Sequence, residues 1–294
     1  MSIILRLTWK ELLRKRVLLL TILMTLAFLV AFWFIAAAIG GETEANGGSG
    51  AALFEKFSMG LFIVGLGFFF GSFVIAFLSI FSSSSVISGE AEQGIMQAMM
   101  PRPVPRWQWY AGRWLGYVTF GLAYALILFS SIMVIAGIHA GVPKNFGALV
   151  SAYLLFASVV PLLVSVSMLG SGFFSGIGNG VFMTMLYGGG WLGGMIDKVS
   201  SQLGSLNEKV GHSLTTISGL LSLAMPADGI QRAMMDRLYN FSYIQDLFNM
   251  GANGGPLPLF GIGSAPAPAF LWYALFYTLA AFLLGMWRFQ KKDL

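Results

Sequence analysis

The sequence predicts an all-α polytopic membrane protein, and three observations support this fold class. Of the 294 residues, 57% are hydrophobic and only 10% are charged, with a mean hydropathy of +0.78. Soluble domains carry about 25% charged residues. Six long apolar runs contain no Asp, Glu, Lys or Arg, and most reach the roughly 20 residues that cross the hydrocarbon core of a bilayer. Because the chain has no cysteine, disulfides, thiolate catalysis and cysteine-based metal sites are excluded.

The first element, residues 1–16, is expected to be a basic, partly amphipathic helix at the inner leaflet. Apolar residues share one face, while basic residues recur at spacing four on another. The apolar face holds Leu5, Trp9, Leu12 and Leu13, and the basic face holds Arg6, Lys10 and Arg14. Such a helix places its cations near anionic headgroups. A cleavable signal peptide is not expected, because the apolar run that follows is long and lacks a clear cleavage site.

Six membrane spans are expected after this helix, and glycine is abundant among them. The spans cover about residues 17–39, 59–81, 114–138, 148–169, 176–196 and 268–287. The 37 glycines fit close helix packing in lipid. The Gly-rich stretch 40–58 is expected to be a flexible outer loop.

A polar segment, residues 86–105, lies between the second and third spans. Ser88 is a candidate N-cap, and Glu90 and Glu92 occupy the first turn, where the helix dipole favours negative charge. Three prolines, beginning at Pro101, end the predicted helix. The segment is therefore expected to form a short helix and a turn between two spans.

This short helix has one soft apolar face. At about 100° per residue, Ile95, Met96, Met99 and Met100 fall together with Glu92 on the same side. Methionine adapts to irregular grooves and is common on binding surfaces. From the residues alone, two interpretations are open: a docking surface for a partner protein, or an interfacial helix against lipid headgroups.

The segment resembles the signature of the type-two ABC transporter permeases. That pattern is Gly-Glu, a short spacer, Gly, an apolar helix, Pro, Ser/Pro-Arg, and Gly-Lys/Arg at the next span. The matching residues are Gly89-Glu90, Gly94, Pro101, Pro105-Arg106 and Gly112-Arg113. The chain departs from the pattern in having Met-Met before Pro101, where leucines are usual. The resemblance implies that the segment is a coupling helix contacting a separate ATP-hydrolysing subunit. The candidate coupling residues are Glu90, Glu92, Ile95, Met96, Met99, Met100, Arg102 and Arg106.

The distribution of positive charge predicts the orientation. With the N-terminus inside, eleven of the 17 Lys and Arg residues fall in inner segments and six in outer ones. The positive-inside rule therefore places both termini and residues 86–105 in the cytoplasm. The resemblance implies the same layout, an elbow helix followed by six spans, in the plasma (inner) membrane.

The outer region between spans five and six, residues 197–267, is expected to form a helical extracytoplasmic cap on the ends of the spans. An apolar stripe predicts one helix, Pro226 ends it, and Asp228 can cap a second helix that runs to about Tyr239. The stripe consists of Val199, Leu203, Leu206, Val210, Leu214, Ile217, Leu220 and Ala224. A substrate-binding module is the less favoured alternative, because the region is too small for a core of its own.

Glycine pairs at small-xxx-small spacing mark the second and fifth spans. They are Gly67/Gly71, Gly189/Gly193 and Gly190/Gly194. Such pairs let helix backbones approach closely, so helix packing within one subunit is the simplest interpretation. The resemblance implies that these two spans line the transport route and the subunit interface. The apolar lining would then be Phe62, Phe69, Phe73, Met185, Tyr187 and Trp191.

Little in the sequence points to catalysis or to ion coupling. Ion-coupled transporters need ionisable residues at depth, and the expected spans contain none. Neither HExxH nor GxxxxGK[ST] is present, so no metal site is expected, and ATP with Mg belongs on the partner subunit. Ser171, between two glycines, is better explained as a helix end than as an intramembrane nucleophile. The net charge of +5 follows from the loops and needs no nucleic-acid partner.

These observations predict the permease subunit of an ABC exporter. It would act as a dimer, preferably with a second copy of itself, embedded in lipid, with ATPase subunits docked on the inner face and no enzymatic activity of its own. A self-contained channel or facilitator is the alternative, and an intramembrane enzyme comes third. The transported substrate is not identified by any motif.

The orientation can be tested by cysteine labelling, since the chain has no native cysteine. Single cysteines at Gly47 and Gly254 should react with a membrane-impermeant reagent added outside the cell. A cysteine at Gln290 should react only after the membrane is opened. Labelling of Gln290 from outside would overturn the predicted orientation.

Overall fold

The computed structural model describes residues 2–43, 50–89, 105–140, 142, 145–203, 208–239 and 266–291. All regular secondary structure in these ranges is helical, which confirms the all-α fold class. The helices are α1 (Ser2–Arg14), α2 (Arg16–Thr43), α3 (Gly50–Ser83), α6 (Arg106–His139), α7 (Phe146–Ser171), α8 (Gly176–Leu203), α9 (Glu208–Ala224), α10 (Ala227–Tyr239) and α12 (Pro268–Lys291).

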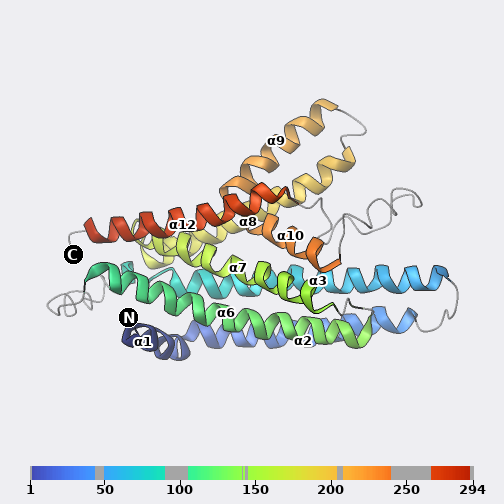
Figure 1. Ribbon diagram of the computed structural model, residues 1–294, viewed down its shortest axis with the longest axis horizontal. Coiled ribbons are helices and arrows are strands. Elements are labelled where there is room, and N and C mark those ends of the chain that lie inside the picture. The colour runs from blue at the N-terminus through green and yellow to red at the C-terminus, as the bar shows by residue number, and fades with distance from the viewer. Residues whose placement is uncertain are drawn as a thin grey trace.

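Five of the described helices are long and apolar enough to cross a membrane, and they lie in α2, α3, α6, α7 and α12. They run side by side along the long axis of the molecule (Figure 1). The α3 helix is central: 67% of its most apolar window is buried, against 17% for α2 and for α12. The Phe68 ring of α3 packs 5.1 Å from Phe129 in α6 and 5.5 Å from Phe156 in α7.

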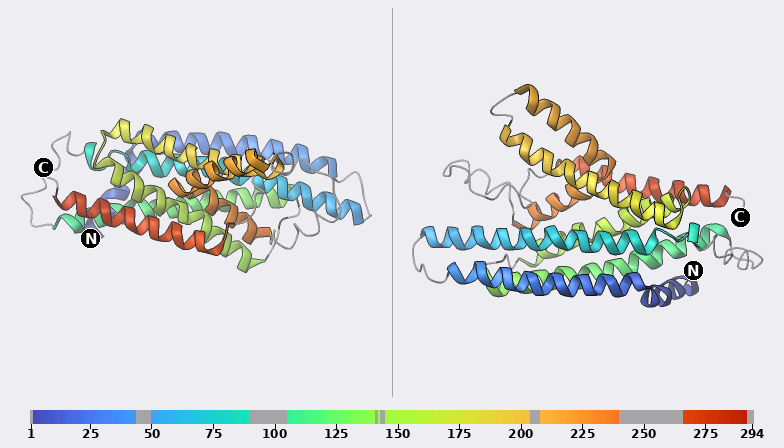
Figure 2. Two further views of the ribbon diagram at one scale, coloured as in Figure 1. Left: turned by 90° about the horizontal axis from the view of Figure 1, so that it is seen from above. Right: turned by 180° about the vertical axis from the view of Figure 1, so that it is seen from behind.

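The fifth expected span, residues 176–196, differs from the other five. The α8 helix covers it without a break, but it is not among the described helices that are apolar enough to span a membrane. Its many glycines and the buried Asn179 dilute its hydropathy. Together with α9, it forms a hairpin that diverges from the long axis of the bundle (Figure 2).

Of the two helices expected in the outer region, the second is present as α10, and Pro226 precedes it. The first was expected to run from Val199 to Ala224, but Val199 and Leu203 belong to the end of α8, and α9 begins only at Glu208 and packs back on α8. However, α10 packs along the sides of α3 and α7 and not only on their ends. The Gln231 side chain donates to the backbone oxygen of Phe68 (3.2 Å), and the Tyr239 hydroxyl donates to that of Gly60 (3.3 Å). Since Phe68 lies more than two turns inside the span that begins at Met59, α10 is inserted between the spans.

The apolar stripe predicted for the first outer helix does not form its packed face. Ile217 and Leu220 of α9 are 49% and 65% exposed, whereas Ser218 and Ser222 are buried against α8. The small residues let α9 approach α8 closely: the Ser218 hydroxyl donates to the backbone oxygen of Gly193 at 2.8 Å. The prediction assumed instead that the large apolar residues would form the packed face.

The stretch 40–58, predicted as a flexible loop, is largely helical. The α2 helix continues to Thr43, and α3 begins at Gly50. Near the end of α2 and the end of α6, Gly40 lies directly against the backbone oxygen of His139, and the Trp33 ring packs edge-on to His139 at 4.7 Å. This close contact supports the helix beyond its apolar core.

The α1 helix packs on α6 by a face slightly different from the one predicted. Thr8 and Leu12 are buried, but Leu13 is exposed and faces away from the bundle. Trp9 belongs to the packed side, and its indole N–H donates to the Thr119 hydroxyl at 3.0 Å. The helix therefore attaches through a mixed polar and apolar strip, and the basic face of Arg6, Lys10 and Arg14 stays exposed.

Candidate functional site

Four chain segments meet at one end of the bundle: α1, the end of α3, the start of α6 and the end of α12 (Figure 1). The predicted coupling segment connects two of them. Its residues Glu90, Glu92, Ile95, Met96, Met99, Met100 and Arg102 lie outside the described residues. The described part resumes at Pro105, and the Arg106 guanidinium donates to the backbone oxygen of Gln290 at 3.1 Å. The structure thus shows how both flanks of this segment are held.

The flank on the α3 side is a serine-rich turn at residues 84–87. The Ser171 hydroxyl, at the end of α7, accepts hydrogen bonds from the backbone N–H groups of Ile87 (3.0 Å) and Ser88 (3.2 Å). The predicted N-cap, Ser88, lies with its own hydroxyl 3.4 Å from that of Ser171. Ser171 therefore serves the helix-end role favoured from sequence, and it does so for another part of the chain.

On the α6 side of the segment, the Gly112-Arg113 pair of the signature packs against α1. Gly112 lies against Ile4, where a Cβ would be 3.0 Å from the Ile4 methyl carbon. The Arg113 side chain is 4% exposed and forms an ion pair with Glu11. Lys15 also pairs with Glu11, at 3.0 Å. These two signature residues thus hold α1 against α6 within one chain.

Lys15 extends this cluster to the other flank. Its ammonium group donates to the backbone oxygen of Ser82, near the end of α3, at 3.4 Å. It also lies 5.7 Å from the centre of the Tyr117 ring of α6. Consequently the junction between α1 and α2 is tied to both helices that flank the predicted coupling segment.

The charges of this cluster reinforce one another. Burial alone would raise the pKa of the Glu11 carboxyl group, but Lys15 and Arg113 together lower that pKa below its ordinary value. Burial would likewise lower the pKa of Lys15, but Tyr117 and Glu11 raise it above its ordinary value. All three side chains are therefore charged at neutral pH.

Several of the predicted pathway residues come together between α3 and α8. The Phe73 ring lies 5.8 Å from Tyr187 and 5.5 Å from Trp191, and Phe69 lies 5.5 Å from Trp191. We call these four rings the α3–α8 aromatic cluster. Met185 does not join it, because its side chain is 72% exposed on another side of α8. Phe62 lies two turns before Phe69 on α3 and is half-buried.

The predicted glycines serve packing within this chain. Gly67 and Gly71 face Ile132 of α6, with Gly67 also against Phe32 of α2. In α8, a Cβ on Gly193 would lie 2.7 Å from Leu221 of α9, whereas Gly189 is only in ordinary contact with Leu221.

Gly190 and Gly194, one turn apart on α8, receive the junction between α9 and α10. A Cβ on Gly190 would lie 2.6 Å from the backbone oxygen of Met225, and one on Gly194 would overlap the Asp228 carboxylate. These two glycines of the expected fifth span therefore allow the α9–α10 junction to pack closely on α8.

A buried ion cluster in this region was missed in the sequence. Arg232 of α10 pairs with Asp197 of α8 at 2.8 Å and with Asp228 at 3.0 Å. The Arg232 and Asp228 side chains are only 9% and 7% exposed. Their i,i+4 spacing indicates a helical ion pair, but nothing in the sequence indicates that α10 is inserted among the spans. These ionisable residues are thus buried inside the protein, although they lie outside the six expected spans.

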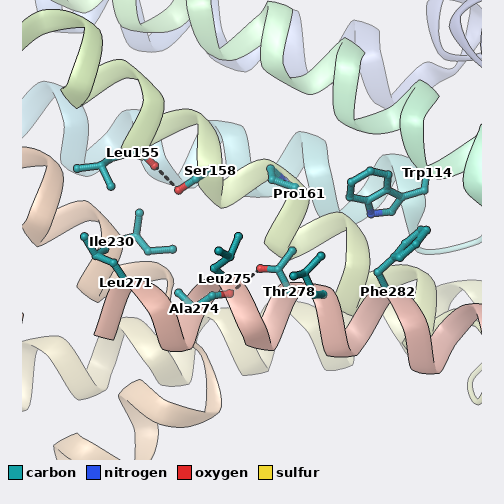
Figure 3. Close-up of a pocket in the computed structure, with 11 residues that line it drawn as sticks. Trp114, Leu155, Ser158, Pro161, Ile230, Leu271, Ala274, Leu275, Thr278 and Phe282 are labelled. Carbon is teal, nitrogen blue, oxygen red and sulfur yellow. Dashed lines mark hydrogen bonds between the residues drawn. The ribbon is translucent and has the colours of Figure 1, made fainter. Parts of the chain in front are cut away.

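A separate cavity of about 460 Å³ lies between α7 and α12 (Figure 3). Its lining is almost wholly apolar, and the hydroxyls of Ser158 and Thr278 are bonded within their own helices. None of the twelve predicted pathway residues lines this cavity. Among the described residues, no group of three His, Cys, Asp or Glu side chains is placed to hold a metal ion.

Five described helices that are long and apolar enough to cross a membrane, packed side by side with shorter helices, define a polytopic membrane protein. The chain belongs to the ABC-2 transporter family: the model of that family, described as ABC-2 family transporter protein, matches residues 3–294. This match confirms the resemblance drawn from the signature. Among curated proteins, none matches the chain closely enough to count as a relative.

The close contact at Gly190 of α8 predicts that alanine will affect stability differently at Gly190 and at Gly188. Gly190→Ala should lower the free energy of unfolding by about 1–3 kcal/mol, because the new methyl group meets a backbone oxygen that cannot rotate away. Gly188→Ala is the matched control, since nothing lies within 4 Å of its Cβ position. It should be neutral or stabilising by up to about 1 kcal/mol, from helix propensity. Thermal unfolding of the purified protein measures both, and equal melting of the two variants would contradict this packing.

The α1 ion cluster predicts a pH-dependent contribution to stability. Glu11→Gln should lower the free energy of unfolding by about 1–2 kcal/mol at neutral pH. This is the low end for a hydrogen bond to a charged group, because the Glu11 side chain is 34% exposed and water weakens the pair. Since the folded pKa of Glu11 is lowered, its stabilisation is complete above the ordinary value of 4.5 and is lost as pH falls through the folded pKa.

Thermal unfolding at several pH values tests this expectation. The difference between wild type and Glu11→Gln should vanish in acid, and Lys10→Gln on the exposed face should change nothing at any pH. If the stability difference between wild type and Glu11→Gln stays the same below the folded pKa of Glu11, the ion pair is not its source.

Proposed function

We propose that this chain is the permease subunit of a dimeric ABC exporter, powered by ATP hydrolysis on a separate ATPase subunit. The observation that carries the proposal is the signature at Gly89–Arg113, which joins two spanning helices at the end of the bundle where α1 and the end of α12 also lie. Family membership supports a transport role for the membrane subunit. The excess of Lys and Arg in the segments at this end supports a cytoplasmic location for it. The plasma membrane is proposed from the resemblance.

The ATPase is proposed to dock on the inner face at residues 86–105. Both flanks are fastened: Ser171 holds the α3 side, and the Glu11–Arg113 pair holds the α6 side. A segment anchored at both ends can pass a push on to the spans without being displaced alone. ATP and Mg would bind the partner, because the chain has no phosphate-cradling loop.

A second copy of the chain is the proposed partner within the membrane. One side of α8 carries large exposed apolar residues, including Ile177 (86%) and Met185 (72%), while α9 covers another side. With the α3–α8 aromatic cluster behind it, this exposed side is suited to face a shared, uncharged route between two subunits. The export direction follows from the resemblance alone.

A self-contained channel or facilitator is the second candidate. The observation that favours it is the buried Asp197–Arg232–Asp228 cluster, because buried charges beside membrane spans can mark an ion pathway. Co-purification of an ATPase distinguishes the two candidates. Affinity purification of the tagged chain from native membranes should bring down an ATPase, and a chain that transports in vesicles with no ATPase bound would establish the second candidate.

The coupling face can be tested by a matched pair of substitutions. Met99→Asp places a charge on the predicted docking face and should weaken ATPase binding by about 2 kcal/mol or more, the usual cost of losing a buried interface anchor. Gln97→Asp, on the opposite face of the same predicted helix, should have little effect. Pull-down of the ATPase and its hydrolysis rate in the complex are the readouts. Similar behaviour of the two variants would show that the predicted face is wrong.

A further inference from the structure

One carboxamide ties three helix ends together beside the proposed coupling segment. Asn179, in the first turn of α8, is completely buried. Its Nδ2 group donates to the backbone oxygen of Ser84, just after α3, at 2.9 Å and to that of Ser167 in α7 at 2.8 Å. The amide orientation is fixed by chemistry, because only the NH₂ group can face two carbonyl oxygens.

Ser171 adds a second bond set between the same elements. Its hydroxyl accepts from the N–H groups of Ile87 and Ser88, and both residues are buried. In addition, the Ser167 hydroxyl donates to the backbone oxygen of Ile80 at 3.3 Å. The last turn of α3 and the turn that follows it are therefore held by α7 and α8 along their whole length.

Two glycines allow these elements to interlock. A Cβ on Gly176, the first residue of α8, would lie 2.8 Å from the Ser85 side chain. A Cβ on Gly170, near the end of α7, would overlap the Asn179 carboxamide. The contact is thus a close-fitting joint, which we call the serine–asparagine joint, made by Ser84–Ser88, Ser167, Ser171 and Asn179.

The Asn179 carboxamide uses only one of its two polar atoms in this joint. Its Oδ1 atom is buried and has no hydrogen-bond partner among the described residues, and an unpaired buried acceptor costs about 1–3 kcal/mol. Its Nδ2 group satisfies two backbone oxygens that an apolar side chain would leave without this donor. The carboxamide therefore fixes the end of α3 relative to both α7 and α8.

We propose that Asn179 and Ser171 are positioning residues that pass a displacement of Gly89 to the inner ends of α7 and α8. Gly89 is the last described residue before the proposed docking segment, and its backbone N–H bonds to Ser85 inside the joint. Because the joint grips the backbone of residues 84–88, a push on this segment moves α8 together with α3. The proposal rests on the proposed function, since the ATPase supplies the push.

The experiment measures movement of α8 in the complete complex. Spin labels are placed on cysteines introduced at Leu19 of α2 and Ile177 of α8, which are 70% and 86% exposed. The chain has no native cysteine that would compete. Labelled chain is diluted with unlabelled chain, so that only distances within one chain are read, and the co-purified ATPase is trapped with ATP and vanadate.

In the wild type, trapping should shift the Leu19–Ile177 distance. Ser171→Ala and Asn179→Ala should each lose more than half of that shift while still binding the ATPase. Thr184→Ala is the matched control, because its hydroxyl bonds only to Gly180 of the same helix, and it should keep the full shift. Ser171→Ala removes a single oxygen atom, so it tests the joint even if Asn179→Ala fails to fold.

Each other result has a distinct meaning. If no ATPase binds the wild-type chain, the proposed function fails and this proposal fails with it. If the ATPase binds and the wild type shifts, but Ser171→Ala shifts equally, the joint is a static clamp and only this proposal is overturned. A loss of shift matched by an equal loss in Thr184→Ala would also overturn it.

Discussion

Helices surrounded by lipid gain little free energy by touching through apolar side chains, because lipid tails offer those side chains the same environment. What holds this protein together is therefore close backbone approach and interhelical hydrogen bonding. Gly67 lets α3 approach α2 and α6, and Gly190 seats the start of the outer hairpin on α8. Asn179 bridges the ends of three helices. The rest of the architecture depends on these few small and polar residues.

This constraint explains which features could be predicted from the sequence. Element type followed from hydropathy, so α1, α10 and five of the six expected spans were found close to their positions. The boundary between α8 and α9 was missed, because the apolar stripe runs through it without a break. The packed faces were also harder to predict: Ile217 and Leu220 of α9 face outward, while the small Ser218 packs against α8. The small-xxx-small glycines were the exception, since their spacing reports packing directly.

The candidate site was predictable only where a local motif carried it. The signature located the segment between α3 and α6, and its Gly112-Arg113 pair proved to bind α1 through Ile4 and Glu11. The contacts of Lys15 with Ser82 and of Ser171 with Ile87 join residues 67 and 84 positions apart, so no sequence pattern shows them. The depth of α10 was hidden for the same reason, because Gln231 meets Phe68 only in the folded chain.

The two polar clusters differ in a way that bears on mechanism. The Asp197–Arg232–Asp228 cluster joins two helices by charge, and breaking a buried ion pair leaves an uncompensated charge that commonly costs 3–5 kcal/mol, roughly. The serine–asparagine joint uses neutral hydrogen bonds of about 0.5–1.5 kcal/mol net each. A single bond of that size is weak, but the joint has five between α3 with its following turn, α7 and α8, and they act on the same few residues. The two clusters therefore fix α8 in different ways: many neutral bonds at its start, and a few strong ion pairs near Asp197.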